Sequence, residues 1–200
     1  MKKIQLEEGS VSNIKYDDLN ISTLFQVYDE KSAVHLIGDL YLRVDDNGKS
    51  IAEFYIDKST KEYYTKIYKN YFLTFAIENG NRYLIIEQAE FDKTFALSNK
   101  GNSKIGNKDN SVEIEITDYE HEWGTNAPPS EDGNASYFDD VHYSLKAKVK
   151  NIVKDFSFYS SEIKGNLSID LEGYCIIILS DIYKDSSCLI EMKIIKKETK

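Results

Sequence analysis

The sequence predicts an all-β fold, and its periodicity, composition and turn signals all favour this class. Apolar residues recur at every second position in most segments, which is typical of half-buried strands. Fifteen tyrosines stand against two prolines and ten glycines, which favours strands over loops. Asparagine–glycine pairs follow two of the alternating segments, where hairpin turns are expected. With 200 residues and no repeat or dividing linker, the chain predicts a single domain over 1–200. This domain would be a β-sandwich or wide β-barrel of roughly ten to twelve antiparallel strands.

The first hairpin is predicted around Asn47–Gly48. Alternation on both sides matches Val44 to Ala52, and this match requires a loop with an odd number of residues. A three-residue loop built on a type I turn with a glycine bulge provides one. A tight two-residue turn would set Leu42 against Glu53 and bury a charge.

A second hairpin is predicted over residues 71–89, with its turn centred on Gly80. Pairing about this glycine places Phe75 opposite Ile85 on the core face. The preceding segment has the form of a capping box and could begin a short helix near 59–70. The tyrosines of that segment suit a strand equally well, so both structures stay open.

The C-terminal part of the chain also predicts strands. Residues 98–110 are polar and contain glycine, which indicates a loop. Residues 163–171 alternate, and residues 174–179 are apolar on both faces, as in a central strand. Residues 189–195 complete the set.

The two cysteines are predicted to be buried and reduced. With a turn near Lys184, Cys175 faces Ile194 and Cys188 faces Asp181, which leaves the thiols too far apart to bond. The first residues lack the apolar segment of a signal peptide, and no window is long enough for a membrane helix. The sequence therefore predicts a soluble cytoplasmic protein with no membrane partner; a mature form trimmed of a signal peptide stays open.

The charge of the chain is concentrated in one segment. Between Lys108 and Lys146 there is no lysine or arginine, but there are ten acidic residues. The formal charge of the whole chain is −9, so the remainder is close to neutral. A local field of one sign attracts a cationic partner, such as a basic protein surface or a metal ion. The acidic residues are Asp109, Glu113, Glu115, Asp118, Glu120, Glu122, Glu131, Asp132, Asp139 and Asp140.

An acidic hairpin is predicted over residues 111–150. Val112, Ile114 and Ile116 lie on its inner face by alternation. The register we expect is the one that forms cross-strand ion pairs, although a slip of two residues keeps every side chain on its face. The expected register pairs Glu113 with Lys150, Glu115 with Lys148, His121 with His142 and Trp123 with Asp140.

Acidic residues occupy the inner positions in the distal half of this hairpin, at Asp118, Glu120 and Glu122. The sequence therefore predicts that both strands extend beyond the core as a projecting arm. Its tip, 124–136, is too long for a tight turn, and loops of this length are often functional. Negative charge combined with aromatic anchors is typical of a protein-binding surface. The predicted binding residues are Tyr119, Glu120, Glu122, Trp123, Glu131, Asp132, Tyr137, Phe138, Asp139 and Asp140.

No motif indicates catalysis, because a nucleophile elbow, a phosphate-binding glycine loop and a cysteine–histidine pair are all missing. His121 and His142 are the candidates for transition-metal ligands, without a further motif to support them. The acids of 131–134 and 139–140 could bind calcium, but they lack the alternating spacing of a calcium loop. The sequence therefore predicts no metal and no cofactor. Nucleic-acid binding is disfavoured, because the aromatic-rich surface is acidic.

These observations predict a non-catalytic protein-binding domain that docks its acidic hairpin on a basic protein. Its most concrete form is an immunity-type inhibitor of a basic toxin or nuclease, from a bacterium or phage. One alternative is a β-sandwich or barrel that binds carbohydrate or lipid, with or without calcium. The other is a metal-dependent enzyme centred on His121 and His142. The sequence leaves the oligomeric state open.

Overall fold

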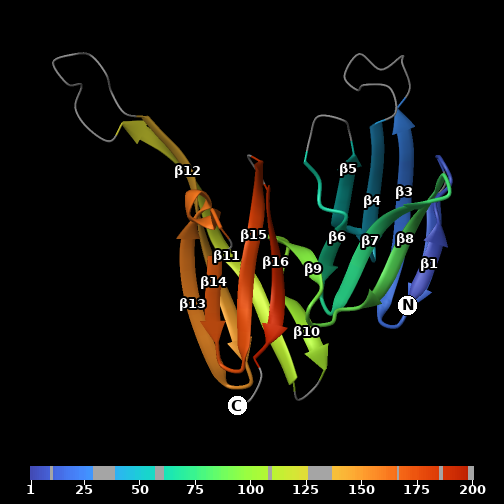
Figure 1. Cartoon of the computed structure of the whole chain (residues 1–200). Coiled ribbons are helices and arrows are strands. Elements are labelled where there is room, and N and C mark those ends of the chain that lie inside the picture. The colour runs from blue at the N-terminus through green and yellow to red at the C-terminus, as the bar shows by residue number, and fades with distance from the viewer. Residues whose placement is uncertain are drawn as a thin grey trace. The chain divides into compact units, whose positions relative to one another are not determined.

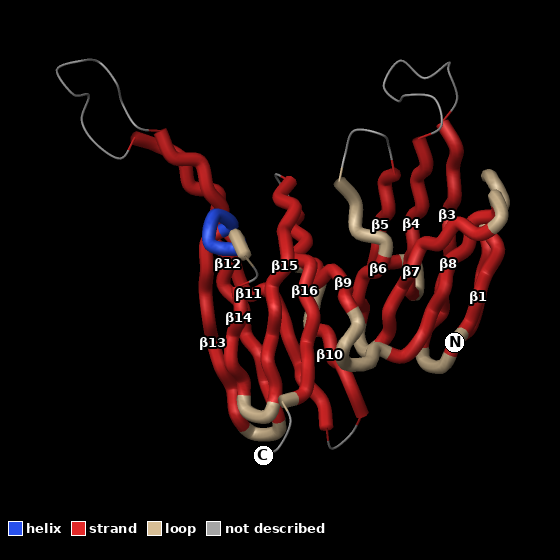
Figure 2. The backbone as a smooth tube through the Cα atoms, in the orientation of Figure 1, coloured by secondary structure: helices blue, strands red, loops and turns tan. Residues whose placement is uncertain are grey.

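The structure is a computed structural model, and the all-β prediction is confirmed. It describes residues 1–9, 11–28, 39–56, 61–107, 110–125, 137–165, 167–184 and 187–197. These residues contain sixteen strands and one short 3₁₀ helix, more strands than expected (Figures 1 and 2). The strands form several sheets, and they do not close into a barrel. The chain divides into two compact units, unit 1 (Met1–Glu90) and unit 2 (Phe91–Lys200), and each is described by itself; the single domain over 1–200 stays a prediction.

Unit 1 consists of two layers of four antiparallel strands. One layer has the order β2-β3-β4-β5, and in the other the order is β1-β8-β7-β6. Strands that follow one another in the chain are neighbours in a layer, as in an up-and-down meander, and β8 also pairs with β1. The exceptions are β1 with β2 and β5 with β6, which lie in different layers. The strands are β1 (Lys2–Gln5), β2 (Val11–Tyr16), β3 (Leu19–Tyr28), β4 (Asp39–Asp46), β5 (Lys49–Ile56), β6 (Thr65–Tyr68), β7 (Tyr71–Glu78) and β8 (Asn81–Gln88).

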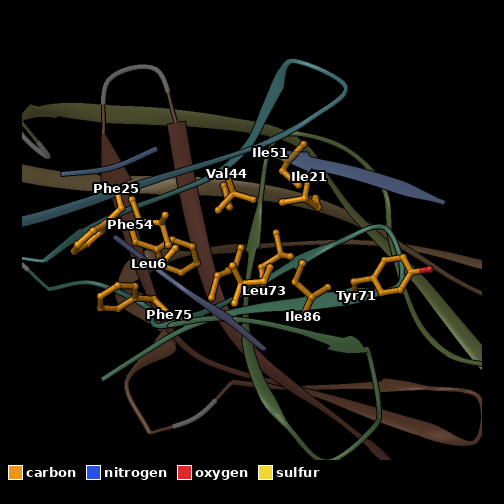
Figure 3. Packing of buried hydrophobic residues seen from close by; sticks show 14 of the residues in the cluster. Leu6, Ile21, Phe25, Val44, Ile51, Phe54, Tyr71, Leu73, Phe75 and Ile86 are labelled. Carbon is orange, nitrogen blue, oxygen red and sulfur yellow. The ribbon is translucent and has the colours of Figure 1, made fainter. Parts of the chain in front are cut away.

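The core of unit 1 lies between these two layers. Phe75 of β7 contacts Phe25 of β3 and Phe54 of β5, with ring centroids 6.3 and 6.2 Å apart (Figure 3). All three rings are buried in one hydrophobic cluster that draws residues from both layers. Burial of apolar area at about 25 cal/mol per Å² makes this interior the main source of stability.

The predicted pairing of the first hairpin is confirmed, but the predicted turn type is wrong. Val44 faces Ala52, as the core pattern requires. The turn itself has two residues, Asn47 and Gly48, both with positive φ (51° and 75°). The register is restored by a bulge next to Val44, which places one extra residue, Ile51, in β5.

The predicted register of the second hairpin is wrong by one residue. Phe75 faces Leu84, and Ile85 points to the other side of β8. The cause is the turn, which has only the two residues Asn79 and Gly80, with φ of 49° and 80°. A two-residue turn of this kind matches the twist of the flanking strands.

The alternative of a short helix near 59–70 is wrong for the part that is described, residues 61–70. Residues Thr65–Tyr68 form β6, which pairs with β7. Glu62 does not cap a helix, because its carboxylate accepts hydrogen bonds from the backbone N–H groups of Tyr55 and Tyr63. It also forms a 3.0 Å ion pair with Lys66, and both side chains are buried.

Unit 2 also has two layers of four antiparallel strands. Their orders are β10-β11-β12-β13 and β9-β16-β15-β14. The predicted loop at 98–110 is wrong in part, because Ser103–Asn107 form a strand. The elements are β9 (Thr94–Ser98), β10 (Ser103–Asn107), β11 (Asn110–Thr125), β12 (Tyr137–Val149), β13 (Ile152–Tyr159), η1 (Ser160–Ile163), β14 (Leu167–Leu171), β15 (Tyr174–Lys184) and β16 (Ser187–Lys196).

The two units have the same topology, although no repeat is visible in the sequence. In each unit the first strand lies at the edge of one layer, beside the last strand of the unit. The next four strands form one layer, and the final three complete the other. Strands β1 to β8 thus correspond in order to β9 to β16. Similar alternation of apolar residues is enough to specify this topology twice, because the individual side chains are free to differ.

Both cysteines are free thiols, as predicted, but only Cys188 is buried; the predicted burial of Cys175 is wrong, because that residue is partly exposed. Cys188 faces Tyr183, two residues from its expected partner, because the strands pair from Lys184 and Ser187 onward. Cys175 faces Ile195, only one residue from its expected partner, because a register irregularity between Ile178 and Ser180 removes part of this shift. Burial raises the pKa of the Cys188 thiol to about 12, with a smaller contribution from Asp181. Cys188 is therefore an unreactive thiol at neutral pH.

Candidate functional site

The β11–β12 hairpin contains a β-bulge at Thr117 that the sequence prediction missed. Before the bulge, Glu113 faces Lys148 and Ile116 faces Leu145, two residues away from the expected register. After it, the register changes by one, so that Asp118 faces Ser144. The extra residue inverts the alternation of every β11 side chain beyond it.

The bulge divides the distal hairpin into an aromatic face and an acidic face. We name the face toward the second layer the inner face and the opposite one the outer face; paired residues share a face. The inner face carries Tyr119, His121 and Trp123 of β11 with Tyr137, Asp139, Val141 and Tyr143 of β12. The outer face carries Asp118, Glu120 and Glu122 of β11 with Phe138, Asp140, His142 and Ser144 of β12.

The explanation expected for the acids at Asp118, Glu120 and Glu122 is therefore wrong. They do not occupy inner positions of strands that have run past the core, because the bulge turns them outward. The hairpin does extend away from the rest of unit 2 at its far end (Figures 1 and 2). The bulge and the projection of the hairpin act together. The bulge turns the acids toward solvent, and the projection carries the aromatic face beyond the second layer.

The proximal outer face is neutralised by cross-strand ion pairs. Glu113 lies 3.7 Å from Lys148, and Glu115 lies 3.9 Å from Lys146. Such exposed pairs contribute about 0.2–1 kcal/mol each, so they set the local charge balance more than the stability. Beyond Lys146 the described outer face has no lysine on either strand, and the negative charge there has no cross-strand counterpart.

Two of the distal acids are held by the segment that follows β12. Asp140 accepts hydrogen bonds from the backbone N–H of Ser161, at 3.1 Å, and from its hydroxyl. Partial burial opposes ionisation of Asp140, but these bonds outweigh it and lower its pKa. Glu122 accepts a 3.4 Å hydrogen bond from the Tyr159 hydroxyl, and its charge raises the pKa of that tyrosine. Both carboxylates are thus held by hydrogen bonds, and the lowered pKa keeps Asp140 ionised at neutral pH.

The inner face is covered only in its lower part. Tyr183 of β15 contacts the rings of Tyr119 and His121, with centroids 6.1 and 5.1 Å away. Farther out, Trp123 is 77% exposed and Tyr137 is 79% exposed. Two large aromatic side chains that face solvent at the end of one hairpin are unusual for a surface with no partner.

The two histidines do not face each other, so the predicted pairing is wrong. His121 faces Val141 on the inner face, and its Nε2 lies 2.5 Å from Asp139 Oδ1. His142 faces Glu120 on the outer face and contacts the ring of Tyr159. Within the described ranges, no group of three or more histidine, cysteine or acidic side chains could hold a metal ion.

The remaining predicted binding residues differ in their placement. Trp123 faces Asp139, and its predicted partner Asp140 faces Glu122. Phe138 is half-buried and packs on Gly124, where a Cβ atom would come within 3.1 Å of the ring. Glu131 and Asp132 lie outside the described residues.

Sequence reasoning missed three contributors: Tyr159, Ser161 and Tyr183. All three come from elements distant in the sequence, and no local pattern indicates which hairpin residue they contact.

Comparison with protein-family models, curated proteins and solved structures gives no match for this chain. Among the described residues, no helix has the length and apolar character needed to cross a membrane.

Proposed function

We propose that this protein is a non-catalytic binding protein that docks its β11–β12 hairpin on a basic protein partner. The most concrete form is an inhibitor of the immunity type, whose carboxylates occupy the cationic active site of a toxin or nuclease in place of phosphates. The cytoplasm is the compartment we propose, and a reducing environment suits its free cysteines.

One observation carries the proposal: the distal hairpin combines an acidic outer face with an exposed aromatic inner face. Acids on the proximal half have lysines opposite them, whereas those of the distal half do not. Complementary charge steers a basic partner to this end and raises the association rate. Burial of Trp123 would then slow dissociation, as aromatic anchors at interface centres do.

The test begins with capture of the partner from the native host, followed by surface plasmon resonance. The double variant Glu120→Gln and Glu122→Gln should slow association at least several-fold. The matched control is Glu113→Gln and Glu115→Gln, which removes the same charge from the same strand but only where lysines already neutralise it. Its association rate should change much less. If the two variants slowed association equally, the distal acids would not contact the partner, and they would act only through long-range electrostatic attraction.

Trp123→Ala separates the aromatic contribution from the charge. It should accelerate dissociation by at least tenfold and leave the association rate nearly unchanged, because affinity differences among interface variants lie mostly in dissociation. An unchanged dissociation rate would remove the inner face from the interface.

The exposed pair Trp123 and Tyr137 also favours a second candidate, carbohydrate binding by stacking of sugar rings on aromatic faces. In that case the Trp123 variant would lose binding to a glycan array, whereas the Glu120 and Glu122 variant would keep it.

A further inference from the structure

The exposed end of the inner face of the β11–β12 hairpin carries a carboxylate beside two large aromatic side chains. Asp139 faces Trp123 directly across the hairpin. Tyr137 lies two residues before Asp139 on β12 and therefore on the same face. Residues directly opposite each other in an antiparallel pair have Cβ atoms about 4.5–5.5 Å apart, and residues two apart on one strand are separated by about 7 Å. A single group placed over Asp139 is thus within reach of both rings.

The three side chains of this site are open to solvent. Trp123 is 77% exposed and Tyr137 is 79% exposed, and the Asp139 side chain is 79% exposed as well. Closer to the core, Tyr183 of β15 contacts the ring of His121, which lies next to Trp123 on the same face of β11. The site therefore begins where the cover by the second layer ends, and a group of another molecule can enter it.

The direction of the Asp139 carboxylate is set by His121. The two side chains are joined at 2.5 Å between His121 Nε2 and Asp139 Oδ1, and the ring nitrogen donates because a carboxylate accepts. The His121 ring is in turn held at 5.1 Å from the Tyr183 ring. The Asp139 side chain stays mostly exposed, so this bond orients the carboxylate without covering it. His121 is therefore a positioning residue, and Asp139 is the group that a ligand contacts.

The segment around Asp139 supplies no cation of its own. The sequence has no lysine or arginine between Lys108 and Lys146, a stretch that contains ten acidic residues. A surface field of this sign favours a cationic ligand over a neutral one.

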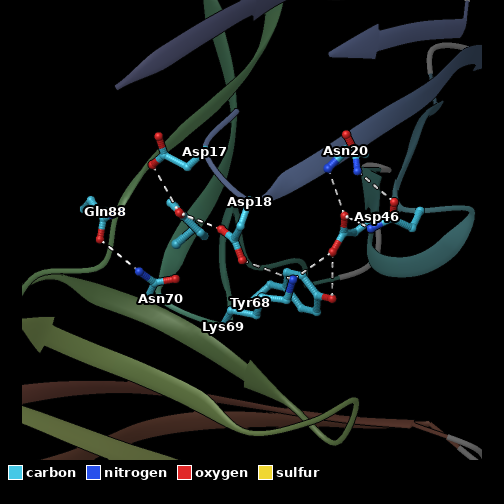
Figure 4. Close-up of polar contacts among 10 residues, drawn as sticks. Asp17, Asp18, Asn20, Asp46, Tyr68, Lys69, Asn70 and Gln88 are labelled. Atoms are coloured by element: carbon cyan, nitrogen blue, oxygen red, sulfur yellow. Dashed lines mark hydrogen bonds and ion pairs between the residues drawn. The ribbon is translucent and has the colours of Figure 1, made fainter. Parts of the chain in front are cut away.

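The polar network of unit 1 shows the contrast (Figure 4). In this network Lys69 Nζ lies 3.6 Å from Asp18 and 3.1 Å from Asp46. The Tyr71 hydroxyl also donates to Asp17 and Asp18, at 3.1 and 2.9 Å. These carboxylates are matched by an ammonium group of the same unit, whereas residues 109–145 offer none to Asp139.

We propose that this site binds an arginine side chain of a partner protein, with the guanidinium group paired to Asp139 and in contact with the rings of Trp123 and Tyr137. The inference rests on the proposed function and specifies which group of the basic partner the inner face takes. A guanidinium group forms charge-assisted hydrogen bonds with a carboxylate and stacks on aromatic faces, so it satisfies both parts of the site at once. The lysine ammonium group is a strongly hydrated point charge that does not stack in this way.

The test is titration of the full chain with capped tripeptides whose central residue is arginine, lysine or citrulline between two glycines, at pH 8 and constant ionic strength. Trp123 is the only tryptophan in the sequence, so its fluorescence reports directly on the site. The arginine peptide should give a saturable change with a Kd of about 1–20 mM. The lysine peptide should bind about threefold more weakly or worse. The citrulline peptide keeps the planar shape but has no charge, and it should not saturate.

Two variants and one control assign the binding to named side chains. Asp139→Asn keeps the size of the side chain and removes its charge, and it should weaken binding of the arginine peptide by about fivefold or more. Tyr137→Leu removes the ring but keeps an apolar side chain, and it should weaken binding about twofold or more. The matched control is Asp155→Asn, the same change on β13, where the residue faces Lys146 on the outer face. Its affinity should equal that of the unchanged chain.

The inference is overturned if the arginine peptide gives no saturable change, or if the citrulline peptide binds equally well. It is also overturned if Asp155→Asn weakens binding as much as Asp139→Asn does. These titrations need no partner protein, so their failure is distinct from failure of the proposed function. If they fail while the double variant of Glu120 and Glu122 still slows association with the captured partner, the hairpin docks on a basic protein without this arginine contact.

Discussion

The same substitution at Tyr71 and at Tyr174 should have effects of different size, because the two tyrosines share a position in the duplicated topology but only the Tyr71 hydroxyl contacts carboxylates of described residues. Replacing tyrosine by phenylalanine removes only the hydroxyl and keeps the buried ring. At Tyr71 it removes contacts to two carboxylates, at 3.1 and 2.9 Å. At Tyr174 it removes no hydrogen bond within the described residues.

The magnitude follows from the kind of bond lost. A hydrogen bond to a charged group contributes about 1.5–3 kcal/mol, but the carboxylates near Tyr71 can regain water after the change. We therefore expect Tyr71→Phe to lower the free energy of unfolding by about 1–2 kcal/mol. Tyr174→Phe should change it by less than about 0.5 kcal/mol, because the buried ring is kept and no hydrogen bond to a described residue is lost.

The assay is urea unfolding followed by far-UV circular dichroism, which reports on strands in both units. Tyr71→Phe should shift the dichroism transition attributable to unit 1. Equal destabilisation by both variants, or none by either, would refute the argument that the polar network stabilises the end of unit 1.

Three further predictions test particular features of the chain. Deletion of Thr117 should lower the free energy of unfolding by less than about 1 kcal/mol, because it removes the bulge and keeps every cross-strand pair. Deletion of Ser144 should prevent folding, and thermal unfolding of the two variants tests both expectations. Asp46→Asn should cost about 2 kcal/mol at pH 7 in urea unfolding. Burial opposes ionisation of Asp46, but its hydrogen bonds outweigh burial and lower the pKa of its carboxyl group. Its contribution to stability is therefore present above about pH 4 and is lost as the pH falls through the lowered pKa. A stability difference between the Asp46→Asn variant and the unchanged chain that persists at pH 2 would contradict this. Gly106→Ala should destabilise the chain by more than about 2 kcal/mol in the same assay, because φ is +89° and the new Cβ atom would overlap backbone and an aromatic ring.

The fold class was predictable because alternation is a local property that survives any error of register. The match of Val44 to Ala52 was predictable for the same reason, since burying a charge would cost more than a bulge. The register of the second hairpin was not, because one residue in the left-handed region at Asn79 decides between a two-residue and a three-residue turn. Composition does not separate those two turns.

The bulge in β11 did leave a signal in the sequence. Apolar residues occupy even positions up to Ile116, and aromatic residues occupy odd positions from Tyr119 onward. A change of parity within a continuous strand is what one inserted residue produces. Interpreting the acids as the end of the core concealed this change, and the predicted facing histidines followed from the same error.

The duplicated topology indicates where function is to be sought. Positions that only maintain the fold keep the same character in both units, such as the buried apolar residues of β7 and β15. The units differ most plainly in one hairpin. The β3–β4 hairpin has strands of 10 and 8 residues, whereas the β11–β12 hairpin has strands of 16 and 13. The greater length does not improve packing, because large aromatic side chains exposed at the hairpin end carry a cost in stability. A feature that departs from the common pattern at such a cost is expected to serve binding, and this argument selects the β11–β12 hairpin over the corresponding hairpin of unit 1.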